Sequence, residues 1–246
     1  SSNDEAAAPA ADLSADSGES ATADTAGDLP RPWRPATAQA TQHTADNPAI
    51  TWPQWTDSVL DGLEGQATKF NANIEAIAVL RAIEREGRSP THDERVALLR
   101  FTGWGGIPAS FNLDGTDAAW KQRARQLSGL LQPGEYESAR ASVNNSHYTE
   151  PFIVRWIWAA LRRLGFEGGR ILDPSSGIGH FLGCMPADVA QRSRVTAIEL
   201  DRISGRILRS LYGACGVDVR IGGFEAATLA EGTYDLILSN VPFGRY

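Results

Sequence analysis

Four short apolar segments recur in the C-terminal part of the chain, and they constrain its fold more than any other feature. They are residues 170–172, 195–198, 217–221 and 234–238. Helical patterns lie between the first three, at about 178–190 and 201–213. Strands that alternate with helices at this spacing form a parallel sheet with packed helices. We therefore expect an α/β fold with a doubly wound, Rossmann-like sheet of about four strands.

The sequence before this sheet predicts helices. Apolar residues recur at helical spacing over about 69–86, and Gly87 ends the pattern. Thr91 and Glu94 are typical of a capped helix start, which predicts a second helix through Leu99. Further helices are expected over the ranges 117–131, 134–143 and 149–164. In the last of these we expect one apolar side formed by Ile153, Trp156, Ile157, Ala160, Leu161 and Leu164.

Residues 1–48 differ in composition from the rest. They are rich in Ala, Asp, Ser, Thr and Pro, and they hold eight Asp or Glu against two Arg. So few large apolar residues cannot offset the entropy of ordering, and we expect a disordered tail. The tail carries most of the net charge of −7, so the remainder is close to neutral. We therefore expect three parts: the tail, a helical region over 49–145 and a ligand-binding core over 146–246.

Composition also narrows the cellular setting. No stretch of about 18 apolar residues is present, and the N-terminus has no apolar signal core, so we expect neither a membrane partner nor secretion. The two cysteines, Cys184 and Cys215, lack metal-type spacing and are expected to be free thiols in the cytoplasm. A metal site is not expected.

A loop with two glycines follows the first expected strand. It covers residues 173–181, with the sequence DPSSGIGHF. Glycine lets a backbone approach a ligand closely, and the start of a helix offers unpaired N–H groups. A dinucleotide site would have a third glycine where Leu182 stands, and Asp173 would repel phosphate. The loop therefore favours a cationic ligand such as one bearing an ammonium group, although an ordinary strand-to-helix turn would also fit.

Two further segments follow later strands. Glu199 stands at the end of the second strand, where a carboxylate can accept both hydroxyls of a ribose. The segment SNVPFG, residues 239–244, follows the fourth strand. Its Asn240 offers a carbonyl acceptor, and its Phe243 can stack on a base that has been flipped out of a duplex.

Together these motifs resemble the class I methyltransferases, and specifically the N6-adenine DNA methyltransferases. Residues 173–181 match the cofactor loop of that family, Asp-Pro-x-x-Gly-x-Gly-x-Phe, at every defined position. Residues 147–151, HYTEP, resemble the Tyr-Thr-Pro motif that contacts the methionine end of the cofactor. Residues 240–243, NVPF, are similar to the catalytic Asn-Pro-Pro-Phe/Tyr.

The resemblance implies S-adenosyl-L-methionine as the cofactor, DNA as the partner and adenine as the methylated base. The implied cofactor-binding residues are Tyr148, Thr149, Asp173, Pro174, Ser175, Gly177, Gly179, Phe181, Glu199 and, in the position of the acid after the third strand, Glu225. The implied catalytic residues are Asn240, Val241, Pro242 and Phe243. Asn240 and the Val241 carbonyl would accept hydrogen bonds from the adenine amine, without a metal or a covalent intermediate.

A narrower resemblance extends over about residues 69–246. The segment GWGG at 103–106, with the motifs above, is similar to very large phage and plasmid proteins that join an adenine methyltransferase to a helicase-like ATPase. Val241 departs from the family by replacing its first proline, and no Gly-x-x-x-x-Gly-Lys-Ser/Thr loop is present. The family fold has about three more strands, so we expect a C-terminal methyltransferase or helicase portion as a partner.

Two alternatives remain open at the level of sequence. RNA methyltransferases and protein-glutamine methyltransferases share a motif like Asn-Pro-Pro-Tyr, although the GWGG segment favours DNA. The second alternative is that the chain is a catalytically incomplete fragment that binds cofactor or DNA. We also expect the chain alone to bind cofactor weakly and to methylate DNA poorly or not at all.

Overall fold

The computed structural model describes residues 52–143 and 148–241. The expected tail over 1–48 lies outside these residues, as do the expected catalytic residues Pro242 and Phe243. No helix in the described part of the chain is long and apolar enough to cross a membrane.

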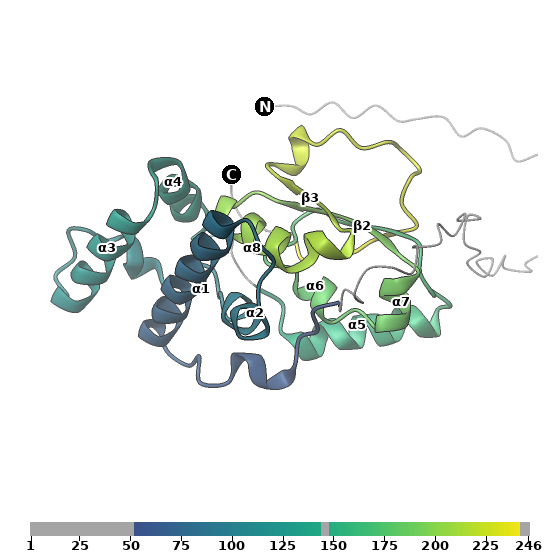
Figure 1. The fold of residues 1–246 in the computed structure, drawn as a ribbon, viewed down its shortest axis with the longest axis horizontal. Coiled ribbons are helices and arrows are strands. Elements are labelled where there is room, and N and C mark those ends of the chain that lie inside the picture. Colours follow the sequence, from purple (N-terminus) through teal and green to yellow (C-terminus); the bar gives the residue numbers. More distant parts are fainter. Residues whose placement is uncertain (1–51, 144–147, 242–246) are drawn as a thin grey trace, which may run out of the picture. The chain divides into compact units, whose positions relative to one another are not determined.

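The first described region is helical, as the sequence predicts (Figure 1). Its elements are η1 (Asp57–Leu60), α1 (Gln66–Glu86), α2 (His92–Leu99), η2 (Pro108–Phe111), α3 (Ala118–Leu130) and α4 (Pro133–Ser142). Helix α1 ends at Gly87, whose φ of 61° is left-handed, and α2 begins with a capping box between Thr91 and Glu94. Both helix boundaries are therefore confirmed, together with the chemistry that was expected to set them.

The second region alternates helices and strands. It contains α5 (Pro151–Arg163), β1 (Arg170–Asp173), α6 (His180–Gly183), α7 (Ala187–Gln191), β2 (Arg194–Glu199), α8 (Arg202–Tyr212), η3 (Gly213–Cys215), β3 (Asp218–Ile221), η4 (Phe224–Ala226) and β4 (Leu236–Ile237). The four strands form one sheet in the order β3-β2-β1-β4, and every neighbouring pair is parallel. The predicted α/β fold with a parallel sheet of four strands is confirmed.

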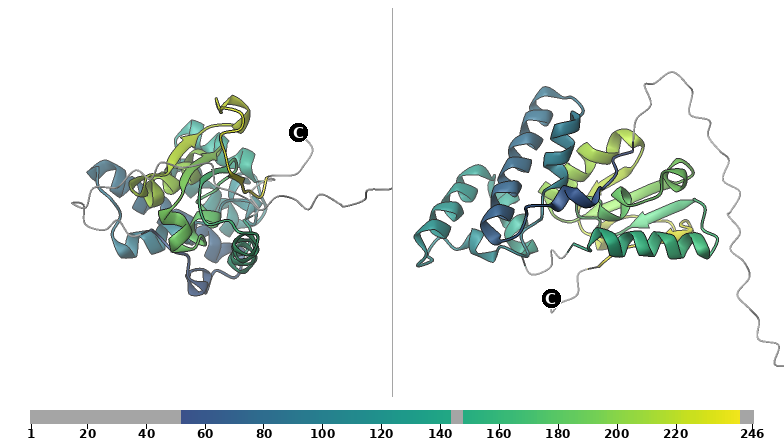
Figure 2. Two further views of the ribbon diagram at one scale, coloured as in Figure 1. Left: turned by 90° about the vertical axis from the view of Figure 1, so that its right-hand side faces the viewer. Right: turned by 90° about the horizontal axis from the view of Figure 1, so that it is seen from below.

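The helical region and the sheet region share one buried core. Helices α1 and α2 lie beside α8, which packs on the sheet (Figure 1, Figure 2). The same hydrophobic cluster contains Trp104 from the helical region, Trp158 from α5 and Tyr212 from α8, all almost fully buried. Because no polar layer separates the two regions, the helical region can contribute directly to a site at the edge of the sheet.

Two details differ from the sequence predictions. The single helix expected over 178–190 is divided into α6 and α7, because Pro186 cannot donate the backbone hydrogen bond that a continuous helix needs. The apolar side expected for α5 is confirmed in part: Ile157 and Leu161 pack against the core. However, Trp156 is 75% exposed, and the buried residues include Val154 and Trp158, which were not expected. Apolar residues surround most of this helix, so spacing alone could not identify the buried face, and the Trp158 indole is fixed by a hydrogen bond to the Phe181 carbonyl at 2.9 Å.

Candidate active site

The glycine loop and Glu199 meet at one edge of the sheet. Strands β1 and β2 are parallel neighbours, with Asp173 opposite Ala197, so their carboxyl ends lie side by side. The Gly177 amide donates a hydrogen bond of 2.7 Å to Glu199 Oε2, and the Ser176 amide donates one of 2.9 Å to the Ile198 carbonyl. The loop is thus fastened to the end of β2, which is where a Rossmann-like fold binds its ligand.

Asp173 is the most buried acid of this edge, at 1% exposure. Its Oδ1 accepts a hydrogen bond from the Ser175 amide at 3.3 Å, whereas its Oδ2 has no hydrogen-bond partner among the residues that the structure describes. Burial raises the pKa of Asp173 to about 7, and the nearby Ser239 hydroxyl and the Ser175 amide only partly oppose this rise. A ligand that brings an N–H donor or a positive charge would satisfy the free oxygen and favour the carboxylate.

Glu199 is only partly buried and already accepts two backbone hydrogen bonds. Its second oxygen, Oε1, accepts the amide of Asp201 at 2.8 Å. Burial and the negative charge of Asp201 raise the pKa of Glu199 to about 7, and the two amides lower it in part. A carboxylate has about four lone-pair positions, so two remain for hydroxyl donors. Asp201 instead caps α8 by accepting the Ser204 amide at 2.9 Å.

Tyr148 lies across the glycine loop. A Cβ atom placed on Gly177, whose φ is +56°, would overlap Cε1 of the Tyr148 ring. The ring also stacks on His180, with 4.5 Å between centroids and 29° between planes. The next residue, Thr149, has a buried hydroxyl without a hydrogen-bond partner in the described part of the chain. Tyr148 and Thr149 are therefore beside the cofactor loop, as the resemblance implies, although their ligand contacts remain predictions.

His180 belongs to this site, and the sequence analysis gave it no role. Its ring lies between Tyr148 and Trp55, whose centroid is 4.1 Å away. Burial lowers the pKa of His180 to about 4, so the imidazole is neutral near pH 7. Its Nδ1 lies 3.2 Å from the Thr149 carbonyl, which can only accept, so Nδ1 carries the proton and Nε2 is an acceptor. Nε2 has no partner within the described residues. The sequence gave no signal because His180 stands at a variable position of the loop motif.

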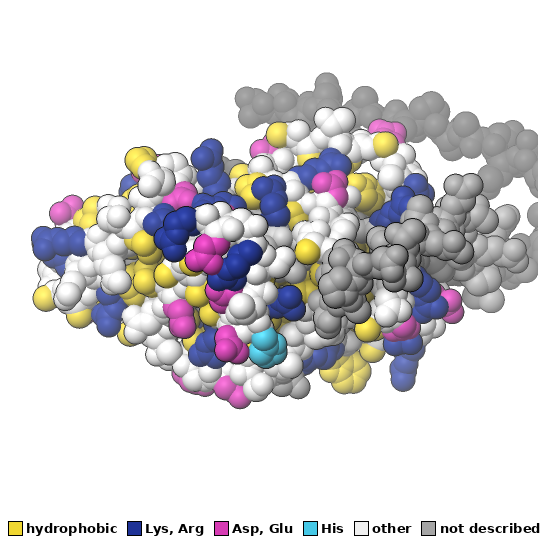
Figure 3. Space-filling model, viewed as in Figure 1, with side chains coloured by type: hydrophobic (Ala, Val, Ile, Leu, Met, Phe, Trp, Pro, Cys, Tyr) yellow, Lys and Arg dark blue, Asp and Glu magenta, His cyan; other side chains and the backbone are white. Residues whose placement is uncertain are grey.

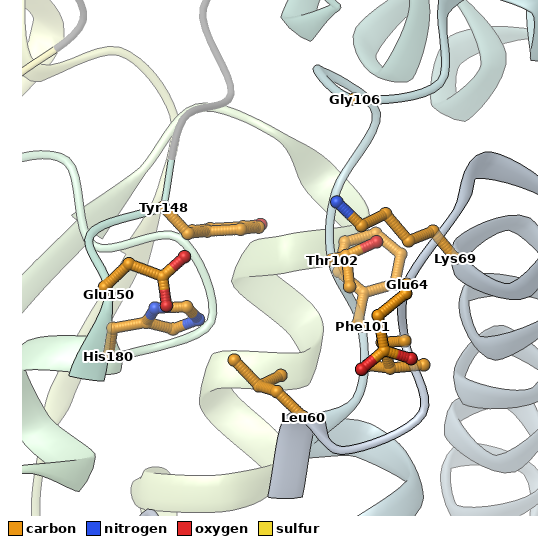
Figure 4. Close-up of a pocket in the computed structure, with 10 residues that line it drawn as sticks. Leu60, Glu64, Lys69, Phe101, Thr102, Gly106, Tyr148, Glu150 and His180 are labelled. Atoms are coloured by element: carbon orange, nitrogen blue, oxygen red, sulfur yellow. The ribbon is translucent and has the colours of Figure 1, made fainter. Parts of the chain in front are cut away.

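A cavity of about 440 Å³ opens beside Tyr148 and His180. Figure 4 shows its two walls. One wall comes from the sheet region and the other from the helical region, and the polar residues that line them are Tyr148, Glu150 and His180, facing Glu64, Lys69 and Thr102. The helical region is thus part of the cavity next to the glycine loop.

The end of β4 brings Asn240 to the same edge of the sheet. β4 pairs with β1 through Leu172 and Ile237, and the Leu238 amide donates to the Leu172 carbonyl at 3.0 Å. Because the strands are parallel, Asn240 follows β4 on the side where Asp173 ends β1. Asn240 is partly buried, and Val241 is 57% exposed.

The remaining predicted residues divide between this edge and its surroundings. Pro174 and Gly179 belong to the loop, and Phe181 is buried in α6 beneath it. Glu225 lies exposed in η4, after β3, which is separated from β1 by β2. The structure therefore brings Asp173, Gly177, Glu199 and Asn240 to one edge, and places Glu225 further along it. No group of three or more His, Cys, Asp or Glu within 52–143 and 148–241 is arranged to hold a metal ion.

The sequence resemblance implies S-adenosyl-L-methionine as the cofactor, and the residues at this edge fit that molecule. The free oxygen of buried Asp173 suits its ammonium group. The lone pairs left on Glu199 suit the hydroxyls of its ribose. The fit rests on these acceptors rather than on an anion-binding loop.

Comparisons with known proteins find methyltransferases among the proteins of similar sequence. No family model matches the chain. "Defense against restriction protein B" of Escherichia phage P1 is 26% identical over 187 residues, which are 75% of this chain and 6% of that protein. "Malonyl-[acyl-carrier protein] O-methyltransferase" of Methylococcus capsulatus is 40% identical over 88 residues, 35% of this chain and 31% of that protein. "Ribosomal protein L11 methyltransferase" of Symbiobacterium thermophilum is 28% identical over 123 residues, 50% of this chain and 38% of that protein.

A solved structure of a putative class I S-adenosylmethionine-dependent methyltransferase from Listeria monocytogenes is similar at a TM-score of 0.36 and 16% identity. The similar region covers 72% of this chain and 60% of the Listeria chain. The chain spans less than two fifths of each of the three sequence relatives.

Proposed function

We propose that this chain is the cofactor-binding part of a DNA methyltransferase that transfers a methyl group from S-adenosyl-L-methionine to the exocyclic amine of adenine. One observation carries the proposal: the pairing of β4 with β1 brings Asn240 to the edge where Asp173 and Glu199 stand. An amide acceptor beside a cofactor site is what an amino-methyltransferase needs to orient its target. Similarity to a phage protein named for defence against restriction supports DNA as the substrate.

In this mechanism the residues position and polarise, and the cofactor supplies an electrophilic methyl group. Asp173 and Thr149 would hold the amino-acid end of the cofactor, and Glu199 would hold the ribose. The side-chain carbonyl of Asn240 and the backbone carbonyl of Val241 would accept the two N–H groups of the target amine. Those hydrogen bonds would orient the nitrogen lone pair, and orientation of this kind supplies a large part of a rate enhancement.

The face of the protein drawn in Figure 3 carries no single basic patch that would mark a DNA-binding surface. Lys and Arg side chains there are interspersed with Asp and Glu. The near-neutral charge of residues beyond 48 fits this pattern. Phosphate contacts need only a local group of basic residues, so we expect the contacts to lie on another face.

Methyl transfer to competing substrates tests the proposal. The 246-residue chain is incubated with tritiated cofactor and, separately, with mixed-sequence DNA, RNA and a glutamine-bearing protein. Because the chain alone is expected to methylate DNA poorly, we expect a low level of label in DNA, and its loss in Asn240→Ala. The control is Asn71→Ala, an exposed asparagine on α1, which should not change transfer.

Other outcomes would replace the proposal. Transfer to RNA or protein alone would move the target to that class, since an Asn-Pro-Pro-Tyr-like motif serves those reactions too. Cofactor binding without any transfer would support the incomplete fragment. Failure to bind the cofactor would overturn the proposal.

A further inference from the structure

The GWGG segment has no part in the mechanism above, yet it is held in place by a buried amide. Asn73 of α1 is fully buried. Its Nδ2 donates to the Gly103 carbonyl at 2.7 Å, and its Oδ1 accepts the Thr102 amide at 2.7 Å. The following residue, Trp104, is also fully buried and packs edge-on against Phe101 at 5.9 Å between centroids. The start of this segment, residues 102–104, is therefore fixed within the helical region.

Gly103 touches the tyrosine that lies across the cofactor loop. Its φ is +67°, and a Cβ placed on it would lie 2.9 Å from Cε2 and 3.1 Å from Oη of Tyr148. The opposite edge of the same ring, at Cε1, faces Gly177 of the cofactor loop. The Tyr148 ring is thus lodged between two glycines, one from each region. A side chain at position 103 would have to push the ring toward the loop or away from His180.

We propose that Asn73 and Gly103 are positioning residues for the cofactor site. Asn73 holds the backbone of residues 102 and 103 in place, and the absence of a side chain at Gly103 leaves space for the Tyr148 ring. The ring in turn lies against the loop at Gly177. The helical region therefore sets the geometry of the loop that binds S-adenosyl-L-methionine. This inference rests on the cofactor site assigned under the proposed function, and it concerns cofactor binding before any methyl acceptor is present.

A pair of matched glycine variants tests it in the full 246-residue chain. Gly103→Ala and Gly87→Ala impose a similar left-handed backbone cost, since their φ values are +67° and +61°, but no described atom lies within 4 Å of a Cβ at Gly87. Calorimetry with S-adenosyl-L-methionine gives Kd, and thermal unfolding without ligand gives Tm. We expect Gly103→Ala to lower Tm at least as much as Gly87→Ala does, and only Gly103→Ala to raise Kd, by about tenfold or more.

A second pair covers the case in which Gly103→Ala does not fold. Asn73→Ala should raise Kd in the same direction, whereas Asn71→Ala, an exposed asparagine on the same helix, should leave Kd unchanged. A double variant then separates positioning from general damage. In a Tyr148→Ala background Gly103→Ala should change Kd no further, because the ring that it displaces is gone.

The outcomes distinguish this inference from the assignment of the site. If Asp173→Ala abolishes binding but Gly103→Ala and Asn73→Ala bind as the wild type does, the positioning role is wrong and the site stands. If the effects of Gly103→Ala and Tyr148→Ala on Kd simply multiply, Gly103 does not act on cofactor binding through the Tyr148 ring. If the wild-type chain does not bind the cofactor, both proposals are overturned.

Discussion

Replacing Asp173 by Asn should change how stability depends on pH. Asn has the same shape as Asp but cannot ionise. In the folded protein burial raises the pKa of Asp173 from 3.8 to about 7. The folded state therefore keeps a proton that the unfolded state releases between these two values. A state that binds more protons is favoured at low pH, so this group makes the folded protein less stable as pH rises from about 4 to about 7.

The size of the effect follows from the pKa and the burial. One pKa unit corresponds to about 1.36 kcal/mol, so the rise from 3.8 to about 7 corresponds to at most about 4 kcal/mol. At 1% exposure solvent hardly screens the carboxylate. The Ser239 hydroxyl can reorient toward a newly formed charge, which reduces the cost. We expect the free energy of unfolding of the wild type to fall by about 2 kcal/mol more than that of Asp173→Asn between pH 4 and pH 8.

Urea unfolding of both proteins at several pH values measures this difference. Glu199, whose pKa is also raised to about 7, is present in both proteins and cancels to first order in the comparison. Parallel pH profiles would refute the reasoning, because they would mean that the Asp173 carboxylate ionises in the fold at no unusual cost. A profile of the opposite slope would mean that a cationic group faces Asp173.

The remaining predictions concern the cofactor, the tail and α5. Glu199→Gln keeps size and removes charge, so it should weaken cofactor binding by about 1–3 kcal/mol, the value of a charge-assisted hydrogen bond; an unchanged Kd in calorimetry would exclude the ribose role. Deletion of residues 1–48 should leave Tm unchanged, because their apolar content is too small to dock, and a fall of several degrees would contradict this. Trp158→Phe leaves the Phe181 carbonyl without its donor, which should cost about 1–3 kcal/mol of unfolding free energy. The exposed Trp156→Phe should change it by less than about 0.5 kcal/mol, and equal effects in urea titrations would mean that the buried face is misassigned.

Local chemistry explains which parts of the fold were predictable. Gly87 and the Thr91 cap determine their helix boundaries within a few residues, so the sequence predicts them. The meeting of Asp173 and Glu199 was equally predictable, because parallel strands place their carboxyl ends at one edge of the sheet.

Features that depend on distant contacts were not predictable in this way. The buried face of α5 depends on a carbonyl of α6, at Phe181. The place of His180 depends on Trp55, 125 residues earlier in the chain, and the role of Gly103 depends on Asn73 and Tyr148. None of these pairings leaves a periodic pattern in the sequence.

Helix α8 explains why the helical region and the cofactor edge cannot move independently. Asp201, which caps it, donates its amide to Glu199 and accepts a hydrogen bond from Ser138 of α4 at 3.1 Å. One turn later Arg206 forms ion pairs with Glu84 of α1 and Glu135 of α4. Displacing α1 or α4 would therefore strain the start of α8, and with it the Glu199 carboxylate. The acid expected to hold the ribose is thus positioned from the helical side as well as by its own strand, independently of the contact between Gly103 and Tyr148.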